Sequence, residues 1–305
     1  QAEDGIRDSV AARGLGDVYK RQILDHPEKP LVNRFNQGLY PPGSIVKMIT
    51  GAVMMDNPDF DPHSEQICEG VFQFGDRVFA CWYINGHGKM SLTSAILNSC
   101  DNYFYKTIQY YELDRLAHYF RLFGFGKPTG IDIVGELKGT IPTTSYMNNR
   151  YGRFGWSKGA LLNFCIGQGE ILVTPMQVFN YTNLLVSRGQ ALRPHFVNMD
   201  QNLENINPNL NTETWDRIIF DMGQVITHEN GTGKRALPLI PEMKVYGKTG
   251  TAENPHGEDH AWFIGWAEYA GQKYSLVILL ENAGSGGMIA EPIDKKIFKE
   301  LVKSE

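Results

Sequence analysis

The sequence has little of what marks several large classes of protein. It carries four cysteines in 305 residues, too few for a scaffold built on disulfides. No apolar run reaches the roughly 18 residues that a membrane-spanning helix requires. Positive charge is also scarce: 29 lysines and arginines face 34 acidic residues, so no basic surface for nucleic acid is indicated. The 42% of hydrophobic residues still suffices for a sizeable globular core.

The first 22 residues differ from the rest of the chain. They show neither helical nor strand periodicity. The string resembles translated sequencing-adaptor sequence, and we expect residues 1–22 to be a non-native segment. Residues 23–305 are then expected to form one domain that lacks its natural N-terminal region.

Residue spacing predicts an α+β fold, in which an antiparallel sheet is flanked by helices and a helical subdomain is inserted. Thr174-Pro175 is a strong helix start. The predicted helices cover 45–55, 91–97, 102–123, 174–187, 213–227 and 291–302. The predicted strands cover 244–252, 261–269 and 273–281, the last two joined by a hairpin at Ala270-Gly271. Residues 56–89 and 129–170 are predicted to be loop-like, and 231–234 to form a turn.

The most informative stretch ends at Lys47. Pro41, Pro42 and Gly43 end any regular structure before them, and Ser44 then begins an apolar run that extends to Met55. A helix that is apolar all round is buried, which places Ser44 at the N-terminus of a central helix. Lys47 follows on the same face one turn later, and a desolvated lysine can activate a serine nucleophile. The alternative is a capping serine beside an exposed charge.

Two further motifs accompany Ser44-Ile45-Val46-Lys47, namely Ser99-Cys100-Asp101 and Lys248-Thr249-Gly250-Thr251. Ser-x-x-Lys, Ser-Asp-Asn and Lys-Thr-Gly, in this order, form the signature of penicillin-binding proteins and class A β-lactamases. From about Ile23 onward the chain resembles the transpeptidase domain of a class B penicillin-binding protein of the elongation type. Supporting stretches are Gly38–Ser44, Gly167–Pro175 and Lys248–Trp262.

The resemblance implies a penicillin-binding/β-lactamase-like fold and a peptidoglycan D,D-transpeptidase that β-lactams inhibit. Ser44 would attack the penultimate D-alanine of a stem peptide and form an acyl-enzyme. Lys47 would be the base, kept neutral by burial and by the charge of Lys248. Ser99 would relay a proton to the leaving amine. An amine from a neighbouring strand would then take the acyl group.

The Lys-Thr-Gly strand is expected to hold the substrate. The hydroxyls of Thr249 and Thr251 would bind its carboxylate, and Gly250 would let its backbone lie close. The backbone N–H groups of Ser44 and Thr251 would form the oxyanion hole.

Asp101 departs from the asparagine of the signature, although some elongation-type enzymes resemble this sequence there. A carboxylate beside Lys47 favours the charged lysine and so opposes the effect of burial. The alternative role for Ser99 and Asp101 is a helix cap.

Three thiolates and an imidazole offer the ligand set of a structural zinc site, on Cys68, Cys81, His87 and Cys100. The position resembles a zinc site of some elongation-type relatives. One structural Zn²⁺ would hold the second motif in place, whereas the acyl transfer itself needs no cofactor. The alternatives are a Cys68–Cys81 disulfide or buried free thiols.

The remaining metal-binding residue types are expected to be structural. Cys165 is assigned to the core. His256 and His260 are assigned to a polar loop on the rim of the cleft, because they lack a helical HExxH pattern.

Other functions stay open at this point. One is a serine β-lactamase, for which no deacylating glutamate is identified; another is a non-catalytic penicillin-binding sensor domain, and a third is an inactive truncated chain. By resemblance, the intact enzyme is tethered to the cytoplasmic membrane with this domain on the periplasmic or extracellular side. Its expected ligands are peptidoglycan stem peptides and β-lactams, and its expected partner is a glycan-polymerising membrane protein.

Overall fold

The computed structural model describes residues 20–26, 29–197, 205–206, 208–238 and 240–303. Its helices are α2 (Arg34–Gln37), α3 (Lys47–Met55), α4 (Leu92–Leu97), α5 (Asp101–Ile108), α6 (Leu113–Leu122), α7 (Thr144–Tyr151), α8 (Gly159–Cys165), α9 (Pro175–Val186), α10 (Thr212–Thr227), α11 (Gly286–Ile289) and α12 (Glu291–Lys303), with 3₁₀ turns η1 (Gly43–Val46) and η2 (Lys234–Ala236). Its strands are β1 (Gln66–Cys68), β2 (Val71–Phe74), β3 (Arg77–Ala80), β4 (Gly88–Met90), β5 (Ala191–Leu192), β6 (Asn205–Ile206), β7 (Lys244–Ala252), β8 (His260–Tyr269) and β9 (Gln272–Leu280).

Most of the expected adaptor-like segment, residues 1–19, lies outside the described residues. Residues 20–24 are helical. The assignment of 1–22 as non-native therefore stays a prediction.

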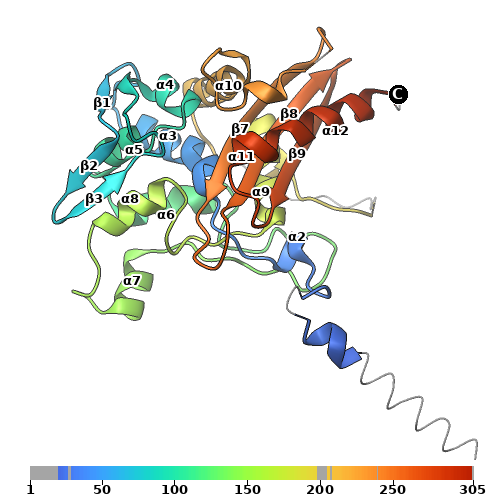
Figure 1. Cartoon of the computed structure of the whole chain (residues 1–305), viewed down its shortest axis with the longest axis horizontal. Helices are drawn as coiled ribbons and strands as arrows, with labels where there is room; N and C mark the ends of the chain where they lie inside the picture. Colours follow the sequence, from blue (N-terminus) through green and yellow to red (C-terminus); the bar gives the residue numbers. More distant parts are fainter. Residues whose placement is uncertain (1–19, 27–28, 198–204, 207, 239, 304–305) are drawn as a thin grey trace, which may run out of the picture.

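The three longest strands form one antiparallel sheet in the order β7–β8–β9 (Figure 1). β7 and β8 pair with Gly250 opposite Trp262. The β8–β9 hairpin turns at Ala270 and Gly271, whose φ angles of 48° and 81° are what a two-residue type I′ turn requires. The predicted strands and hairpin are confirmed.

Helices cover both faces of this sheet. α9 packs on one face, while α11 and α12 lie across the other (Figure 1). α9 begins as predicted, because the Thr174 hydroxyl accepts the N–H of Gln177 while the Gln177 side chain accepts the N–H of Thr174. The predicted α+β fold with flanking helices is confirmed.

α3 is the centre of the helical part. Every residue from Lys47 to Met54 is buried, and α4, α5, α6 and α10 contact this helix. Burying a side chain such as Ile49 stabilises the fold by about 1.5–3 kcal/mol. The predicted buried central helix is confirmed, but it starts at Lys47, and the preceding residues form the 3₁₀ turn η1.

Two predicted loops contain regular elements. Residues 56–89 hold β1, β2 and β3, which pair in the two-stranded ribbons β1–β4 and β2–β3 and pack on α5. Each of these strands is only three or four residues long, which is too short for a clear alternation. Residues 129–170 contain α7 and α8. The sequence of α7 is mostly polar and therefore shows no helical pattern of apolar residues. The helix is stabilised at its start by the Thr143 hydroxyl, which accepts the N–H of Tyr146.

The predicted helix over 102–123 is two helices. α5 ends at Ile108, and α6 begins at Leu113 after Glu112 adopts an extended conformation. Tyr111 is buried in the turn between them, and its hydroxyl donates to the carbonyl of Met54. The helical spacing of aromatic residues continues through this turn, so the sequence pattern did not predict the break between the two helices.

One buried carboxyl group lies behind the central helix. Asp221 on α10 has no exposed surface, and neither oxygen has a donor in hydrogen-bonding geometry among the described residues. Burial raises the pKa of Asp221 to about 7, against the smaller lowering effects of Thr93 and Arg217. The protonated form is therefore preferred in the folded state.

This carboxyl should make stability depend on pH. Because the pKa of Asp221 is higher in the folded than in the unfolded chain, its contribution is full below pH 4 and is lost as the pH rises through 7. Asp221→Asn should remove roughly 2–3 kcal/mol of the fall in unfolding free energy between pH 5 and pH 8. Urea denaturation at both pH values measures this. Asp216→Asn, an exposed position on the same helix, is the control, and equal pH dependence in parent and Asp221→Asn would contradict the assignment.

Candidate active site

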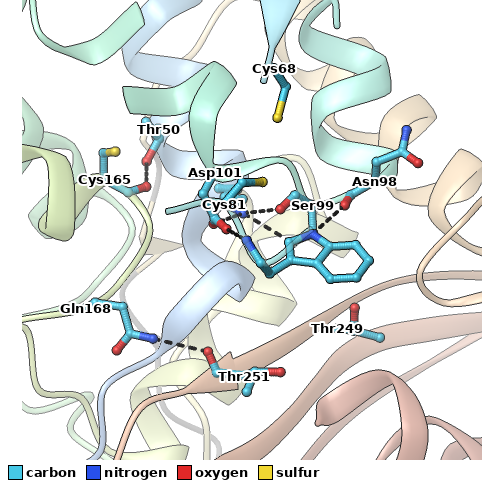
Figure 2. Close-up of polar contacts among 12 residues, drawn as sticks. Thr50, Cys68, Cys81, Asn98, Ser99, Asp101, Cys165, Gln168, Thr249 and Thr251 are labelled. Atoms are coloured by element: carbon cyan, nitrogen blue, oxygen red, sulfur yellow. Dashed lines mark hydrogen bonds and ion pairs between the residues drawn. The ribbon is translucent and has the colours of Figure 1, made fainter. Parts of the chain in front are cut away.

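The three sequence motifs meet at one cleft. A cleft of about 930 Å³ is lined by residues of all three, Ser44, Ser99, Asp101, Thr249, Gly250 and Thr251. Figure 2 shows Ser99 and Asp101 on the helical side and Thr249 and Thr251 on the strand β7 opposite. The volume is that of a small-molecule or peptide site. The structure thus brings residues of all three motifs together at one cleft.

Ser44 lies in η1, one turn before Lys47. Gly43 has a φ of 59°, and its N–H donates to the carbonyl of Gly167. A Cβ on Gly43 would lie 2.4 Å from the carbonyl oxygen of Thr251. A glycine is therefore required here, because only a bare backbone fits between β7 and the segment at Gly167.

Lys47 has no exposed surface, yet all its donors are used. Its Nζ lies 2.7 Å from Asp101 Oδ1, 2.7 Å from the carbonyl oxygen of Ser99 and 3.1 Å from Ser99 Oγ. The alternative of an exposed charge is thus wrong. Lys47 thus forms a buried ion pair with Asp101, the aspartate of the second motif.

Lys248 is equally buried, and no carboxylate among the described residues forms an ion pair with it. Its Nζ lies 2.9 Å from Ser99 Oγ and 2.9 Å from the carbonyl oxygen of Thr249. Burial first, and then the charge of Lys47, lower the pKa of Lys248 well below its usual value. Lys248 therefore favours the neutral form, and the expectation that its positive charge keeps Lys47 neutral is wrong, because burial disfavours that charge.

Ser99 stands between the two lysines. Its φ of 53° is rare for a residue other than glycine, asparagine or aspartate and stores strain at this position. The adjacent Cys100 is the N-cap of α5, and Asp101 is the first residue of that helix. Ser99 and Asp101 do lie at a helix start, but their side chains contact Lys47, so capping is not their main role.

The end of β7 is held by close contacts. The Thr251 hydroxyl accepts the N–H of Gly286, and its carbonyl accepts from Gln168 Nε2 at 3.3 Å (Figure 2). A Cβ on Gly250 would lie 2.8 Å from Ile45 Cγ2. The structure thus shows that Gly250 makes room for η1, whereas the sequence prediction assigned that space to the substrate.

The four predicted metal ligands also converge. Cys68 ends β1, Cys81 follows β3, His87 precedes β4, and Cys100 caps α5. Their ligand atoms all lie within 4.8 Å of one another. His87 Nδ1 is 3.5 Å from Cys68 Sγ and 3.6 Å from Cys81 Sγ. All four cysteines of the chain are free thiols, so the alternative of a Cys68–Cys81 disulfide is wrong.

The other predicted structural residues are placed as follows. Cys165 is fully buried, and its carbonyl accepts the hydroxyl of Thr50. His256 is in the loop before β8, and His260 begins β8, where its Nδ1 accepts the N–H of Asn282. In the described part of the chain, neither histidine belongs to a cluster of potential metal ligands.

Sequence reasoning missed two cleft residues. The backbone N–H of Trp82 donates to Asp101 Oδ2 at 3.0 Å, and its ring Nε1 donates to the carbonyl of Asn98. Gln168 lies in the Gly-Gln-Gly triplet that supported the resemblance, yet no role was assigned to it. Trp82 could have been singled out because it follows Cys81, a predicted metal ligand. Its contact with Asp101 is visible only in the tertiary structure.

A family model described as "Penicillin binding protein transpeptidase domain" matches residues 11–302. Among curated proteins, the peptidoglycan D,D-transpeptidase MrdA of Haemophilus influenzae is 34% identical over 312 residues, which cover 93% of this chain and 48% of the relative. The chain thus spans about half the length of the curated relatives it matches.

Solved structures agree. Pseudomonas aeruginosa PBP2 in complex with WCK 5153 matches with a TM-score of 0.83 and 31% identity, covering 93% of this chain and 63% of that one. A peptidoglycan synthase complex, studied for its coordination of polymerization and crosslinking, matches with a TM-score of 0.81 and 27% identity, covering 92% and 49%. These matches confirm the resemblance to the elongation-type class B enzymes and the penicillin-binding/β-lactamase-like fold. The chain belongs to the penicillin-binding protein transpeptidase domain family.

Proposed function

We propose that this chain is the acyl-transferring domain of a peptidoglycan D,D-transpeptidase with Ser44 as its nucleophile. The observation that carries the proposal is the convergence of two fully buried lysines on the hydroxyl of Ser99, in the cleft that Ser44 lines. Burying an ionisable amine is costly, and such groups beside a cleft mark proton-transfer chemistry.

Lys47 acts as a base once it has lost a proton, and Ser99 provides the route. The Lys47 ammonium passes a proton to Ser99 Oγ, while the hydroxyl proton of Ser99 passes to the neutral amine of Lys248. Lys47 is then neutral and Lys248 is charged. The carboxylate of the bound stem peptide, held near Thr249 and Thr251, stabilises the charge of Lys248. Substrate binding thereby prepares the base.

Acylation then follows. Lys47 takes the proton of Ser44 as the serine oxygen adds to the carbonyl of the penultimate D-alanine. The C–N bond breaks, and the terminal D-alanine leaves after its nitrogen receives a proton through Ser99. The backbone N–H groups of Ser44 and Thr251 stabilise the developing oxyanion.

Deacylation by an amine completes the cross-link. The amine of a neighbouring stem peptide attacks the ester carbonyl and loses a proton, and the Ser44 hydroxyl is restored. One amide bond is broken and one is formed, so the overall reaction needs no external energy source.

The rival functions receive less support. A β-lactamase must activate water for deacylation; the one glutamate that lines the cleft, among the described residues, is Glu253 beyond the end of β7. The curated relatives that match are named D,D-transpeptidases. A sensor domain would acylate without releasing D-alanine from a peptide substrate, which a turnover assay detects.

The ligands of this cleft are then peptidoglycan stem peptides and the β-lactams that mimic them. We propose that the longer protein works at the cytoplasmic membrane beside a glycan-polymerising partner, with this domain on the periplasmic or extracellular side. The match to a peptidoglycan synthase complex that couples polymerization and crosslinking supports this. Within the described residues, no helix has the length and apolar character needed to cross a membrane.

We also propose that Cys68, Cys81, His87 and Cys100 hold one structural zinc ion. A thiolate sulfur and an imidazole nitrogen bound to one tetrahedral zinc lie about 3.6 Å apart. The distances from His87 Nδ1 to two sulfurs, 3.5 and 3.6 Å, fit this value. The ion would stabilise the fold by joining β1, β3, β4 and α5.

The zinc cluster adjoins the catalytic residues. Cys100 lies between Ser99 and Asp101, and Cys81 precedes Trp82, whose N–H donates to Asp101. A zinc ion in the cluster would therefore fix Cys100, which precedes Asp101 in the sequence, and Trp82, which donates to the Asp101 carboxylate. The ion would take no part in acyl transfer.

The intact mass of the protein tests whether Ser44 is the nucleophile. After incubation with benzylpenicillin, the parent should gain the mass of one stable adduct, and Ser44→Ala should gain none. Ser187→Ala, at the end of α9, is the control and should acylate fully. Folding is checked by circular dichroism. A folded parent without an adduct would overturn the proposal, and release of D-alanine from a stem-peptide substrate separates the enzyme from a sensor domain.

Asp101 should be needed for fast acylation, because its carboxylate holds the Lys47 ammonium in a buried ion pair. Asp101→Asn keeps the shape of the side chain but removes the ion pair, so acylation by benzylpenicillin should slow by about tenfold or more. Stopped-flow acylation at pH 7 measures the rate. Asp56→Asn, which alters an exposed ion pair with Arg115, should leave the rate unchanged. An unchanged rate in Asp101→Asn would contradict this role.

Metal analysis tests the zinc site. Purified protein should contain about one zinc per chain, and Cys81→Ser should lose most of it and melt at lower temperature. Cys165→Ser replaces a buried thiol outside the cluster and should keep the metal. Folded parent protein with almost no bound zinc, after preparation without chelators, would exclude the site.

A further inference from the structure

A second groove lies beside the catalytic cleft. It has a volume of about 440 Å³ and is lined by aromatic side chains with polar ones among them, Tyr151, Phe154, Trp156, Phe164, Arg77, Asn163 and Glu170. We call it the aromatic groove. Its walls come from α7, α8, β3 and the turn between α7 and α8; Figure 1 shows α8 beside β3 and α7 at the edge of the molecule.

The aromatic groove and the catalytic cleft share two walls. Ile166 and Gln168 line the cleft, while Gly169 and Glu170 of the same segment line the groove. Likewise, β3 contributes Ala80 to the cleft and Arg77 to the groove. A ligand that fills one site can therefore extend into the other.

The distance suits a peptidoglycan strand. Gly167 contacts Gly43 next to the nucleophile, and Glu170 is three residues further, a span of at most about 11 Å. A stem peptide of about four residues reaches roughly 14 Å from its reacting carbonyl to its sugar. Glycan attached to a peptide acylated at Ser44 thus falls in the range of the groove.

The rings of the groove are held in place. Trp156 Nε1 donates to Asn148 Oδ1 at 2.8 Å, and the Tyr151 hydroxyl donates to Glu170. Phe154 lies in a turn closed by the N–H of Gly155 donating to the carbonyl of Gly152, and its side chain is 94% exposed. A ring that is so exposed adds little to the core, yet its backbone is fixed.

The chemistry of the lining fits a sugar ligand. Aromatic faces carry negative charge and attract the polarised C–H faces of sugar rings. Arg77, Asn163 and Glu170 supply donors and acceptors for hydroxyl and acetamido groups. We propose that the aromatic groove binds the glycan strand of the donor peptidoglycan, with sugar rings on Phe154 and Trp156. This inference rests on the proposed function, because it takes the substrate to be peptidoglycan.

The test uses glycan without peptide. Peptide-free strands of alternating N-acetylglucosamine and N-acetylmuramic acid are titrated into the protein and followed by calorimetry or ligand-observed NMR. The parent should bind them saturably. Phe154→Ala and Trp156→Ala should each weaken binding about three- to tenfold. Tyr110→Ala, which removes an exposed ring outside the groove, should bind as the parent does.

Each outcome decides the proposal. No saturable binding by the folded parent, or equal binding by Phe154→Ala and Tyr110→Ala, would overturn it and leave the groove to a protein partner. Because Phe154 is almost fully exposed, its variant should fold even where Trp156→Ala does not, and thermal melting checks both. Benzylpenicillin acylation of the parent is a separate readout, so failure of the glycan site and failure of the catalytic proposal can be told apart.

Discussion

One residue, Ser99, links the two buried lysines beside the cleft. Buried amino groups are tolerated only where hydrogen-bonding partners surround them, and Ser99 offers oxygen atoms to both Lys47 and Lys248. These residues come from α3, from the connection between α4 and α5, and from β7. Lys47 depends on the contact of α3 with this connection, and Lys248 depends on the contact of β7 with the same connection. The need to satisfy two buried lysines therefore fixes how the helical part meets the sheet.

Two features without catalytic chemistry support that arrangement. Bare backbone at Gly43 and Gly167 lets η1 approach β7, where any side chain would collide with backbone atoms. The thiols and imidazole of Cys68, Cys81 and His87 gather around Cys100 in the second motif. The position of Ser44 thus depends on close backbone packing, whereas the Asp101 carboxylate is held by Lys47 and by the N–H of Trp82.

The parts of the fold that were predictable are those with strong local signals. The helix after Thr174 has a proline and a capping box, and the β8–β9 hairpin has long strands joined at Ala270-Gly271. The short ribbons β1–β4 and β2–β3 carry no such signal, because they are stabilised by packing on α5. The helix α7 was not predicted for the same reason, because its polar sequence lacks an apolar face and its stability comes from its cap and its neighbours.

The sequence alone singled out Ser44, Ser99 and Lys248, because they lie in short motifs whose order and residue types are specific. It also determined the ligand types of the cysteine cluster. Only the tertiary structure decided how protons are shared, since the partner of each buried lysine is distant in the chain. Asp101 forms a buried ion pair with Lys47, whereas burial lowers the pKa of Lys248, which has no such ion pair among the described residues. The aromatic groove, too, arises only from folding, because its walls come from residues 77–170 brought together in space.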